Sequence, residues 1–445
     1  MELKNFFKEE RTILIICFLV FVISAAYAFY YKISPAVDAW NYDTVAMNII
    51  NGNGFRLYPE KPLLQDDVIT YQGPLYQYFL AGIFAVFGHN YEAVWIIHGI
   101  LRVLSALFLF LICKLIFKEN GRKTGWIAAA FFGFYPDLIE MGAMLMAETL
   151  YIFSTILIIY IFFRWYGKDS MIGIFLLGLI TGLTTLIRST GGLIFLPVFI
   201  FYFFKYRKWK QLILFLILFF LILTPWTIRN YKIYHAFIPT MANAGYNLWT
   251  GNHEGGDGEG GNVPSHFEDL AKYGAIGANN YSLRQFKNFL LDHPLTYIKF
   301  TATRSIKYFS FIRPMGFWFY QSGWSQLIFV FSSALASVFL FTFGFAGIFA
   351  AIKKEINNTF LIYLIAISFL TFLSVVPVLF ETRYRLPIYP FMAIFAGFFI
   401  VRIIVFRSDY LRYLVSSFLI LSFIASINII LEYGKILEKM KQIFS

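Results

Sequence analysis

Long apolar runs alternate with polar segments along most of the chain. Eleven runs have the length and apolar character expected of membrane-spanning helices: 12–31, 92–117, 124–138, 149–166, 171–187, 190–204, 211–228, 326–352, 359–379, 386–406 and 411–431. The pattern predicts an all-α polytopic membrane protein with about 11–13 transmembrane helices, interfacial helices and one large extracytoplasmic loop.

The basic residues predict how these helices are oriented. The apolar stretch 74–88 is ambiguous: if it crossed the membrane, the cluster from Lys114 to Lys123 would lie outside. If it is interfacial or re-entrant, that cluster lies inside, and so do four others: Arg164 with Lys168, the run 205–210, Lys353 with Lys354, and Arg407 with Arg412. We therefore expect 74–88 not to span and the first apolar run to be a retained signal anchor.

This topology divides the chain into three parts. We expect an N-terminal transmembrane module at 1–228 whose first outer loop is 32–91, a large extracytoplasmic loop at 229–323, and C-terminal transmembrane helices at 324–445. The other outward-facing segments are 138–148, 188–189, 380–385 and the C-terminal tail. The glycine-rich stretch 255–261 should be mobile unless something binds it.

Composition agrees with a membrane protein. Apolar residues make up 59% of the chain and charged residues only 14%, against about 25% charged residues in soluble domains. The net charge of +12 would suggest a nucleic-acid partner in a soluble protein. Here the basic residues lie in short loops between apolar runs, so we expect membrane lipids and no nucleic acid as partners.

The first outer loop contains an amphipathic pattern that begins at Asp38. Apolar side chains recur with helical spacing at Tyr42, Val45, Ala46, Ile49 and Ile50, and Asn51 with Gly52 then end the helix. A helix on the outer membrane surface is predicted, with Asp38 at its N-terminus. Taken alone, Asp38 is best interpreted as a helix cap.

Several short motifs in a fixed order change that interpretation. Asp38 and the A-x-N-I-I-x-G-x-G-F pattern after it resemble the first outer loop of the GT-C superfamily of membrane glycosyltransferases, and most closely its protein O-mannosyltransferase and lipid A aminoarabinose transferase branch. Five further segments resemble motifs of that branch: 71–76 (YQGPLY), 186–188 (LIR), 224–231 (TPWTIRNY), 245–252 (GYNLWTGN) and 381–387 (ETRYRLP). Two departures are Ala39, where the family often has Glu, and Gln72, where it has Lys.

The resemblance implies a GT-C fold and the transfer of a sugar from a polyprenyl-phosphate donor to an acceptor on the extracytoplasmic face, with inversion. Such a reaction needs a carboxylate to take the acceptor proton and cations around the departing phosphate. Asp38 is the expected general base, and Glu148 the second acid. The expected phosphate-binding residues are Arg188, Arg229, Arg383, Tyr384 and Arg385. The expected donor or acceptor contacts are Tyr42, Gln72, Asn247, Trp249, Asn252 and Glu381.

Other polar residues have structural interpretations. Glu148 could equally be a surface acid or the partner of a buried arginine, and Asp137 is expected to be a cap or turn residue. Arg102 lies about 15 Å into its span, so it should face the bundle and form a structural ion pair. His98, in the same span, is expected to be a packed, hydrogen-bonded histidine.

Cofactor, acceptor and cellular location are less constrained. No cofactor is certain, although His253, Glu254, Asp257 and Glu259 leave a divalent cation possible. The acceptor could be a lipid, a protein or a glycan. We expect a prokaryotic plasma (inner) membrane protein whose active site faces outside. A transporter or flippase of lipid-linked sugars is the main alternative, and a non-catalytic scaffold protein is another.

Overall fold

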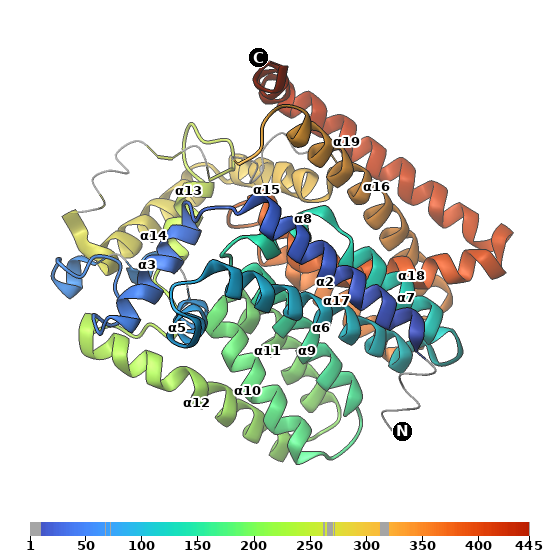
Figure 1. The fold of residues 1–445 in the computed structure, drawn as a ribbon, viewed down its shortest axis with the longest axis horizontal. Coiled ribbons are helices and arrows are strands. Elements are labelled where there is room, and N and C mark those ends of the chain that lie inside the picture. The colour runs from blue at the N-terminus through green and yellow to red at the C-terminus, as the bar shows by residue number, and fades with distance from the viewer. Residues whose placement is uncertain are drawn as a thin grey trace.

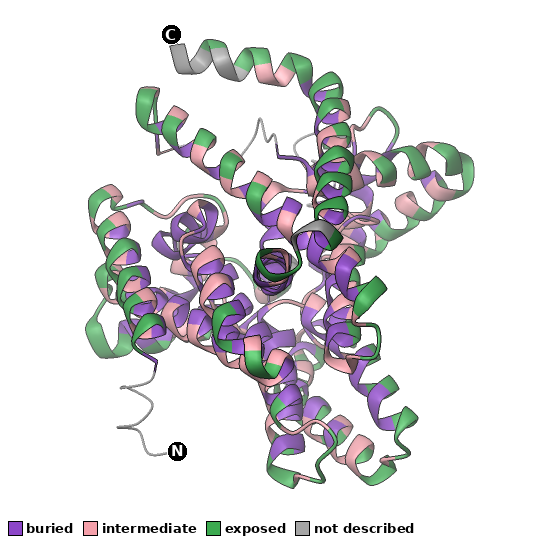
Figure 2. Ribbon diagram, turned by 90° about the vertical axis from the view of Figure 1, so that its right-hand side faces the viewer, coloured by how far each residue is buried: buried purple, intermediate pink, exposed green. Residues whose placement is uncertain are grey.

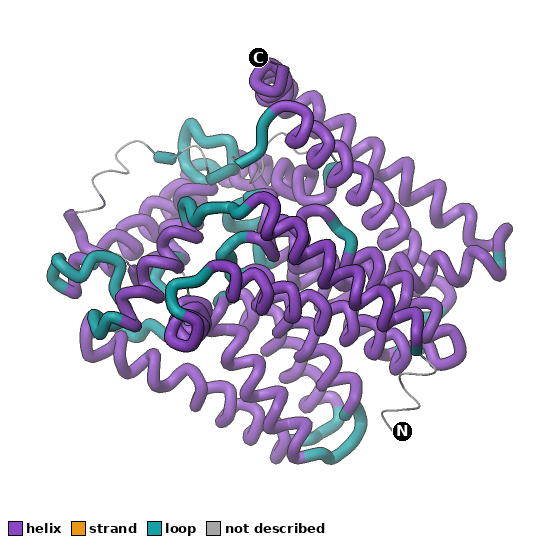
Figure 3. Tube along the Cα trace, in the orientation of Figure 1, coloured by secondary structure: helices purple, strands orange, loops and turns teal. Residues whose placement is uncertain are grey.

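The computed structural model describes residues 10–66, 68–71, 73–260, 263–264, 270, 272–311 and 320–444, and these ranges are almost entirely helical (Figures 1 and 3). The first half of the chain forms α2 (Arg11–Tyr31), α3 (Asp38–Ile50), α4 (Val68–Tyr71), α5 (Leu75–Phe87), α6 (Tyr91–Phe117), α7 (Gly121–Gly133), α8 (Pro136–Ala143), α9 (Glu148–Arg164), α10 (Met171–Ile187), α11 (Thr190–Lys205) and α12 (Trp209–Tyr234). Short 3₁₀ turns, η1 (Leu63–Gln65) and η2 (Lys118–Asn120), connect some of them.

The second half continues with outer helices and then with further apolar helices. These are α13 (Ala244–Gly251), α14 (Gly274–Asp292), α15 (Pro294–Phe309), α16 (Gly323–Lys354), α17 (Thr359–Leu373), the 3₁₀ helix η4 (Thr382–Ile388), α18 (Tyr389–Val405) and α19 (Arg407–Phe444). Exposed positions follow the outward faces of the helices, and buried positions face the interior (Figure 2). The exposed faces of α2, α12 and α19 carry many large apolar side chains, as lipid-facing surfaces do.

Six helical regions within the described residues are long and apolar enough to cross a membrane, or seven if the bent pair α8–α9 forms one span. The chain is therefore an integral membrane protein. The number is lower than the predicted 11–13, in part because α10, α11 and α17, which match three of the predicted spans, have only 15–17 residues, whereas a span needs about 20.

α6 and α7 follow one another with only the short polar turn η2 between them, and they fold as a hairpin. Gly121 of α7 lies against the backbone of Lys114 in α6, and Gly125 lies against Phe110. A Cβ atom at Gly121 would approach the Lys114 Cα to 2.7 Å, so the close packing of α6 and α7 depends on glycine. The predicted span 124–138 is divided between α7 and α8.

The predicted basic loops gather at one end of the bundle. Ion pairs lie there between Glu10 and Lys114 (2.6 Å), Glu10 and Arg122 (3.0 Å), Asp169 and Lys208 (2.8 Å), Lys354 and Asp409 (2.8 Å), and Glu355 and Arg402 (2.5 Å). The loops are joined through Asn358, which donates to the Ile116 carbonyl, and through Phe360, whose ring packs on those of Phe163 and Tyr166. This arrangement is consistent with the prediction that the five basic segments lie on one side of the membrane if 74–88 does not span it.

Arg102 is buried in α6 as predicted, but its partners are neutral. One guanidinium nitrogen donates to the Ser24 hydroxyl and another to the Gly133 carbonyl at 2.7 Å. Among the described residues it forms no ion pair, so the expected acidic partner was wrong. The hydroxyl and carbonyl groups satisfy the charge locally, which a membrane interior requires. His98 is hydrogen-bonded to Tyr76 and to the Gly142 carbonyl, which confirms its structural role.

Candidate active site

The helix that carries Asp38 forms as the sequence pattern predicts. α3 begins at Asp38, buries Tyr42, Val45 and Ala46, and ends at Ile50. Its buried face packs on α5, where the ring of Tyr42 meets that of Tyr76 edge-on. α5 is 13 residues long, or about 20 Å, too short to cross the roughly 30 Å apolar core of a bilayer. This length agrees with the prediction that α5 does not span.

Asp38 is not a helix cap. The capping position is Val37, and no side chain caps this helix. The Asp38 carboxylate instead pairs with the guanidinium of Arg383, more than three hundred residues later in the chain. Arg383 also binds Glu381 through Nε at 3.0 Å. The residues of the first outer loop and of the 381–387 motif therefore meet, as their common outer side predicted.

A second acid and a second arginine extend this cluster. Glu148 begins α9 at the sharp bend of 118° after α8, and its side chain is completely buried. Its Oε1 accepts a hydrogen bond from Arg188 Nη2 at 2.5 Å and lies 3.9 Å from Arg383 Nε. Glu148 thus lies between two arginines, and four of the predicted outer segments contribute to one ionic cluster.

Gly73 explains how Arg188 is held in place. It precedes α5 and packs so tightly against the end of α10 that a Cβ atom would lie 2.6 Å from the Ile187 carbonyl oxygen. The contact brings the segment before α5 against the residue that precedes Arg188. The glycine of the 71–76 motif is therefore required by close backbone packing, because any side chain would push the two segments apart.

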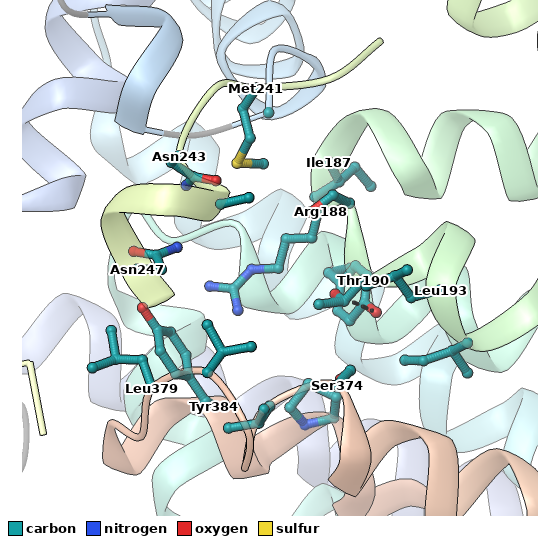
Figure 4. Close-up of a pocket in the computed structure, with 18 of the residues that line it drawn as sticks. Ile187, Arg188, Thr190, Leu193, Met241, Asn243, Asn247, Ser374, Leu379 and Tyr384 are labelled. Atoms are coloured by element: carbon teal, nitrogen blue, oxygen red, sulfur yellow. Dashed lines mark hydrogen bonds between the residues drawn. The ribbon is translucent and has the colours of Figure 1, made fainter. Parts of the chain in front are cut away.

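A cavity of about 250 Å³ opens beside this cluster. Side chains from α3, α9, α11, α13, α17, η4 and the adjoining loops surround it. Its lining includes the polar residues Asp38, Tyr42, Tyr151, Arg188, Thr190, Asn243, Asn247, Ser374, Arg383 and Tyr384, together with apolar residues such as Leu193, Met241 and Leu379. Figure 4 shows the Arg188 side chain extending into this space toward Asn247 and Tyr384. The cavity is polar on the arginine side and apolar along Leu193 and Leu379.

Neighbouring charges and aromatic rings affect the ionisable side chains that line the cavity. Burial raises the pKa of Tyr42, and the nearby carboxylates of Glu148 and Asp38 raise it further, so its hydroxyl stays protonated. Burial lowers the pKa of Arg188, but Glu148 and the neighbouring tyrosines more than compensate, and the pKa lies above its usual value. The Tyr384 ring lies 5.8 Å from the Arg188 guanidinium and 5.3 Å from that of Arg383, within the range of cation–π attraction.

Of the predicted site residues, six lie on the cavity wall and two lie directly behind it. Asp38, Tyr42, Arg188, Asn247, Arg383 and Tyr384 line the cavity, and Glu148 and Glu381 bind its arginines. Gln72 lies outside the described residues. The remaining four residues lie elsewhere.

Arg385 does not face the cavity. It is fully buried among α15, α16 and α18, where it donates to the Tyr389 hydroxyl (2.6 Å), the Ser310 carbonyl (2.7 Å) and the Ser337 hydroxyl (2.9 Å). Asp137, expected to be a cap or turn residue, is buried in the same region and accepts from Ser333 and Tyr389. The predicted phosphate contact by Arg385 is corrected to a structural role.

Arg229 is also held away from the cavity. Its guanidinium donates to the Phe55 carbonyl at 3.1 Å and to the Asn230 side chain at 2.9 Å. It lies over the Trp226 ring, 4.8 Å from its centre. Arg229 therefore ties the end of α12 to the segment after α3, and its placement does not support the predicted phosphate contact.

Trp249 and Asn252 hold the outer loop in place. Trp249 is buried and packs edge-on against Tyr281 of α14. Asn252 accepts from Arg304 at 2.8 Å and donates to the Val378 carbonyl at 2.9 Å. Within the 245–252 motif, Asn247 and Leu248 reach the cavity, since α13 exposes one face to it and packs its other face on α14 and on residue 378.

The sequence did not single out Tyr151, Thr190, Met241, Asn243 or Ser374, which also line the cavity. Thr190 and Ser374 lie within or beside apolar helices, where a small hydroxyl residue carries no distinctive signal. Asn243 precedes the 245–252 motif, and its helical spacing of four from Asn247 could have predicted that both face the same way.

Two of the acidic residues that were considered for binding a divalent cation, Asp257 and Glu259, form ion pairs with lysines. Glu259 binds Lys307 at 2.8 Å and Lys435 at 2.5 Å, and Asp257 binds Lys435 at 3.2 Å. Burial raises the pKa of Asp257, but the Glu259 amide and Lys435 outweigh it and keep that pKa below its usual value. The described residues contain no group of three metal-ligating side chains. The stretch is also held by a bridge between Glu259 and Phe380.

Comparison with known proteins agrees with the fold. The family model described as dolichyl-phosphate-mannose-protein mannosyltransferase matches residues 71–228. No curated protein matches the chain significantly.

Two solved structures share the architecture. The Archaeoglobus fulgidus oligosaccharyltransferase tethered to an acceptor peptide is 16% identical, with a TM-score of 0.53 over 98% of this chain and 56% of that one. ArnT from Cupriavidus metallidurans bound to undecaprenyl phosphate is 12% identical, with a TM-score of 0.51 over 96% of this chain and 73% of that one. This chain thus spans little more than half the length of the archaeal enzyme. The resemblance to GT-C glycosyltransferases is confirmed at the level of the fold.

Proposed function

We propose that this chain is an inverting membrane glycosyltransferase that moves a sugar from a polyprenyl-phosphate donor to an acceptor on the extracytoplasmic face. The observation that carries the proposal is the meeting of Asp38 with Arg188 and Arg383 at one cavity. A base and a pair of phosphate-binding cations are the two groups that such a transfer requires. The GT-C fold and the mannosyltransferase family match over 71–228 support it.

In the proposed reaction Asp38 takes the proton of the acceptor hydroxyl. The hydroxyl oxygen forms a bond to the anomeric carbon as the bond from that carbon to the phosphate oxygen breaks. The electron pair of the broken bond leaves with the polyprenyl phosphate, and attack from the opposite side inverts the anomeric centre. Atoms and charge balance without a further reactant, since the proton ends on Asp38 and the negative charge on the phosphate.

Arg188 and Arg383 are the proposed partners of that phosphate. Each already binds a carboxylate, Glu148 and Asp38 respectively, so a donor phosphate would compete with Asp38 for Arg383. Displacement of Arg383 toward the phosphate would free the Asp38 carboxylate to accept a proton. Donor binding would thus prepare the base, and Tyr384 lies beside both guanidinium groups to support the exchange.

Glu148 is best assigned a positioning role. It does not line the cavity, it is completely buried, and its Oε1 binds Arg188. We therefore propose that Glu148 orients the two arginines and that Asp38 alone acts as the base, in place of the predicted pair of catalytic acids.

The cavity suggests how donor and acceptor divide the space. The ArnT structure holds undecaprenyl phosphate, and the archaeal oligosaccharyltransferase carries an acceptor peptide; we extend the polyprenyl-phosphate donor to this chain and leave the acceptor as a lipid, protein or glycan hydroxyl. Asn243 and Asn247 belong to the 229–323 region, which we propose selects the acceptor. We further propose a prokaryotic plasma membrane, with the basic end in the cytoplasm and the cavity outside.

Replacing Asp38 by Asn tests the proposal whichever sugar the donor carries. Cells that lack the gene should accumulate one polyprenyl-phosphate sugar, detected by mass spectrometry of lipid extracts. The wild-type gene should return that lipid to its basal level, and Asp38→Asn should not, with an expected loss of about 10²–10⁴-fold in transfer. The matched control is Asp43→Asn: Asp43 is on the same helix but binds His89 and Tyr91.

Full activity of the Asp38→Asn protein at normal expression would contradict the assignment. The alternative, a flippase of lipid-linked sugars, is separated by reconstitution in liposomes. A flippase would move the accumulated lipid across the bilayer and form no glycosidic bond, whereas the proposed enzyme would consume the lipid when an acceptor is present.

A further inference from the structure

A second cavity of about 230 Å³ lies at the basic end of the bundle, away from the active-site cluster. It is formed where the turn between α6 and α7 meets the start of α17 and the end of α18. Its polar lining residues are Lys118, Asn120, Thr124, Glu355, Asn358 and Arg402, and its apolar ones are Ile116, Phe117, Phe398 and Val401. None of these residues takes part in the proposed transfer.

The polar side of this cavity carries two cations and one acid. Lys118 adopts a left-handed backbone conformation (φ 42°) that turns the chain between α6 and α7. It is exposed and forms no ion pair within the described part of the chain. Arg402 binds Glu355 at 2.5 Å and lies 5.7 Å from the centre of the Phe398 ring. One cationic charge therefore remains uncompensated at the cavity.

A buried hydroxyl also faces the cavity. Thr124 is 1% exposed and lines the cavity. The hydroxyl of a threonine at this position can donate a hydrogen bond to a bound anion. Asn120, the residue before α7, also lines the cavity.

The apolar side indicates what kind of anion fits. The rings of Phe117 and Phe398 stack at 5.1 Å with an interplanar angle of 14°, and they form a wall beside the cations. A phosphate attached to an apolar chain would meet cations and the Thr124 hydroxyl at one side and these rings at the other. The location agrees, because clustered basic residues at the cytoplasmic surface attract anionic lipids.

We propose that this cavity binds the phosphate headgroup of an anionic phospholipid. The bound phosphate would accept hydrogen bonds from Lys118, Arg402 and Thr124, while the glycerol and upper acyl chain lie along Phe117 and Phe398. The lipid would join the α6–α7 turn to α17 and α18, two parts of the chain whose direct polar link there is the 3.5 Å contact from Asn358 to the Ile116 carbonyl. Its binding therefore stabilises the packing of the N-terminal and C-terminal helices.

Native mass spectrometry of the full chain in detergent tests the site. The protein is titrated with phosphatidylglycerol, with phosphatidylcholine, and with inorganic phosphate, and thermal unfolding is followed in parallel. We expect retention of phosphatidylglycerol with a rise in unfolding temperature, and weaker retention of phosphatidylcholine. The double variant Lys118→Gln with Thr124→Val should retain phosphatidylglycerol about tenfold less well. Lys168→Gln, which removes an exposed charge from the same end but outside the cavity, should retain it normally.

Three outcomes would overturn the proposal. Equal retention of phosphatidylglycerol by the double variant and the wild type excludes this cavity as the site. Equal retention of phosphatidylcholine excludes recognition of an anionic headgroup. Stabilisation by inorganic phosphate without retention of phosphatidylglycerol replaces the lipid with a soluble phosphate. Size-exclusion profiles that match the wild type show that the variants are folded, and the separate lipid arms keep the result independent of enzymatic activity.

Discussion

Arg383 and Arg385 stand two residues apart in the same short segment, yet they lie in opposite environments. Arg383 faces the cavity, where three carboxylates surround it: Asp38, Glu148 and Glu381. Arg385 points into the protein, where it binds the Tyr389 and Ser337 hydroxyls and the Ser310 carbonyl. Identical residues in one motif therefore serve different purposes.

The geometry of η4 explains the separation. A 3₁₀ helix has three residues per turn, so side chains two positions apart point about 240° from each other. Arg383 and Arg385 thus emerge on different sides of the same turn. The charged motif therefore indicates that the segment lies near the site, and the geometry of the helical turn determines which of its arginines reaches the cavity.

The two arginines also differ in how their charge is balanced. Several carboxylates surround Arg383, so it can exchange one of them for a phosphate oxygen and its positive charge stays balanced. Arg385 has a fixed set of neutral acceptors, and loss of its guanidinium would leave the Ser310 carbonyl and two hydroxyls buried without it. Such losses are costly in a buried site. We therefore expect an effect on activity at Arg383 and an effect on stability at Arg385.

Among the variants that test this comparison, the largest effect is expected from Arg383→Gln. Removing a cation that faces the departing phosphate should reduce transfer by about 10²–10³-fold, with an unfolding temperature close to that of the wild type. Accumulation of the lipid-linked sugar in cells and binding of undecaprenyl phosphate by the purified protein measure it. A variant with normal turnover would show that Arg383 only orders Asp38 and does not touch the donor.

Arg385→Met should give the reverse result. We expect a loss of about 3 kcal/mol in the free energy of unfolding, followed by thermal unfolding in detergent, while the folded fraction keeps near-normal transfer. Tyr389→Phe, which removes one acceptor of the same guanidinium, is a milder control of about 1 kcal/mol. Loss of transfer in a stable Arg385→Met protein would contradict the separation of the two arginines.

Glu148→Gln should give the smallest change. The amide keeps a hydrogen-bond acceptor for Arg188 but removes the charge that holds it, so the apparent KM for the donor should rise about tenfold with a smaller change in kcat. Steady-state kinetics with varied donor separates the two parameters. A fall in kcat as large as that of Asp38→Asn, at unchanged KM, would restore Glu148 as a second catalytic acid.

Several elements were predictable because they depend on local spacing. The 3.6-residue period after Asp38 predicted the amphipathic helix α3, with Asp38 at its N-terminus, and the distribution of basic loops predicted which ends of the helices lie together. The predicted topology also placed the acids and arginines of the outer segments on the same side of the membrane, although it did not predict their individual contacts.

The lengths of the helices and the partners of the buried charges could not be predicted in this way. The runs 92–117 and 124–138 predicted the α6–α7 hairpin, but not that 124–138 is divided between α7 and α8, nor that Arg102 would be satisfied by Ser24 and the Gly133 carbonyl. Those contacts join residues far apart in the chain, and many arrangements satisfy the same pattern.

The amino-acid pattern was enough to establish that the chain is a helical membrane protein, that Asp38 begins an amphipathic helix, and that its acids and arginines share one side. Helix packing was needed to show that Asp38 pairs with Arg383, that Glu148 holds Arg188, and that Arg229 and Arg385 are turned away. The reason is that local periodicity and topology restrict each segment separately. The direction of a side chain within a cavity depends instead on contacts between residues tens to hundreds of positions apart.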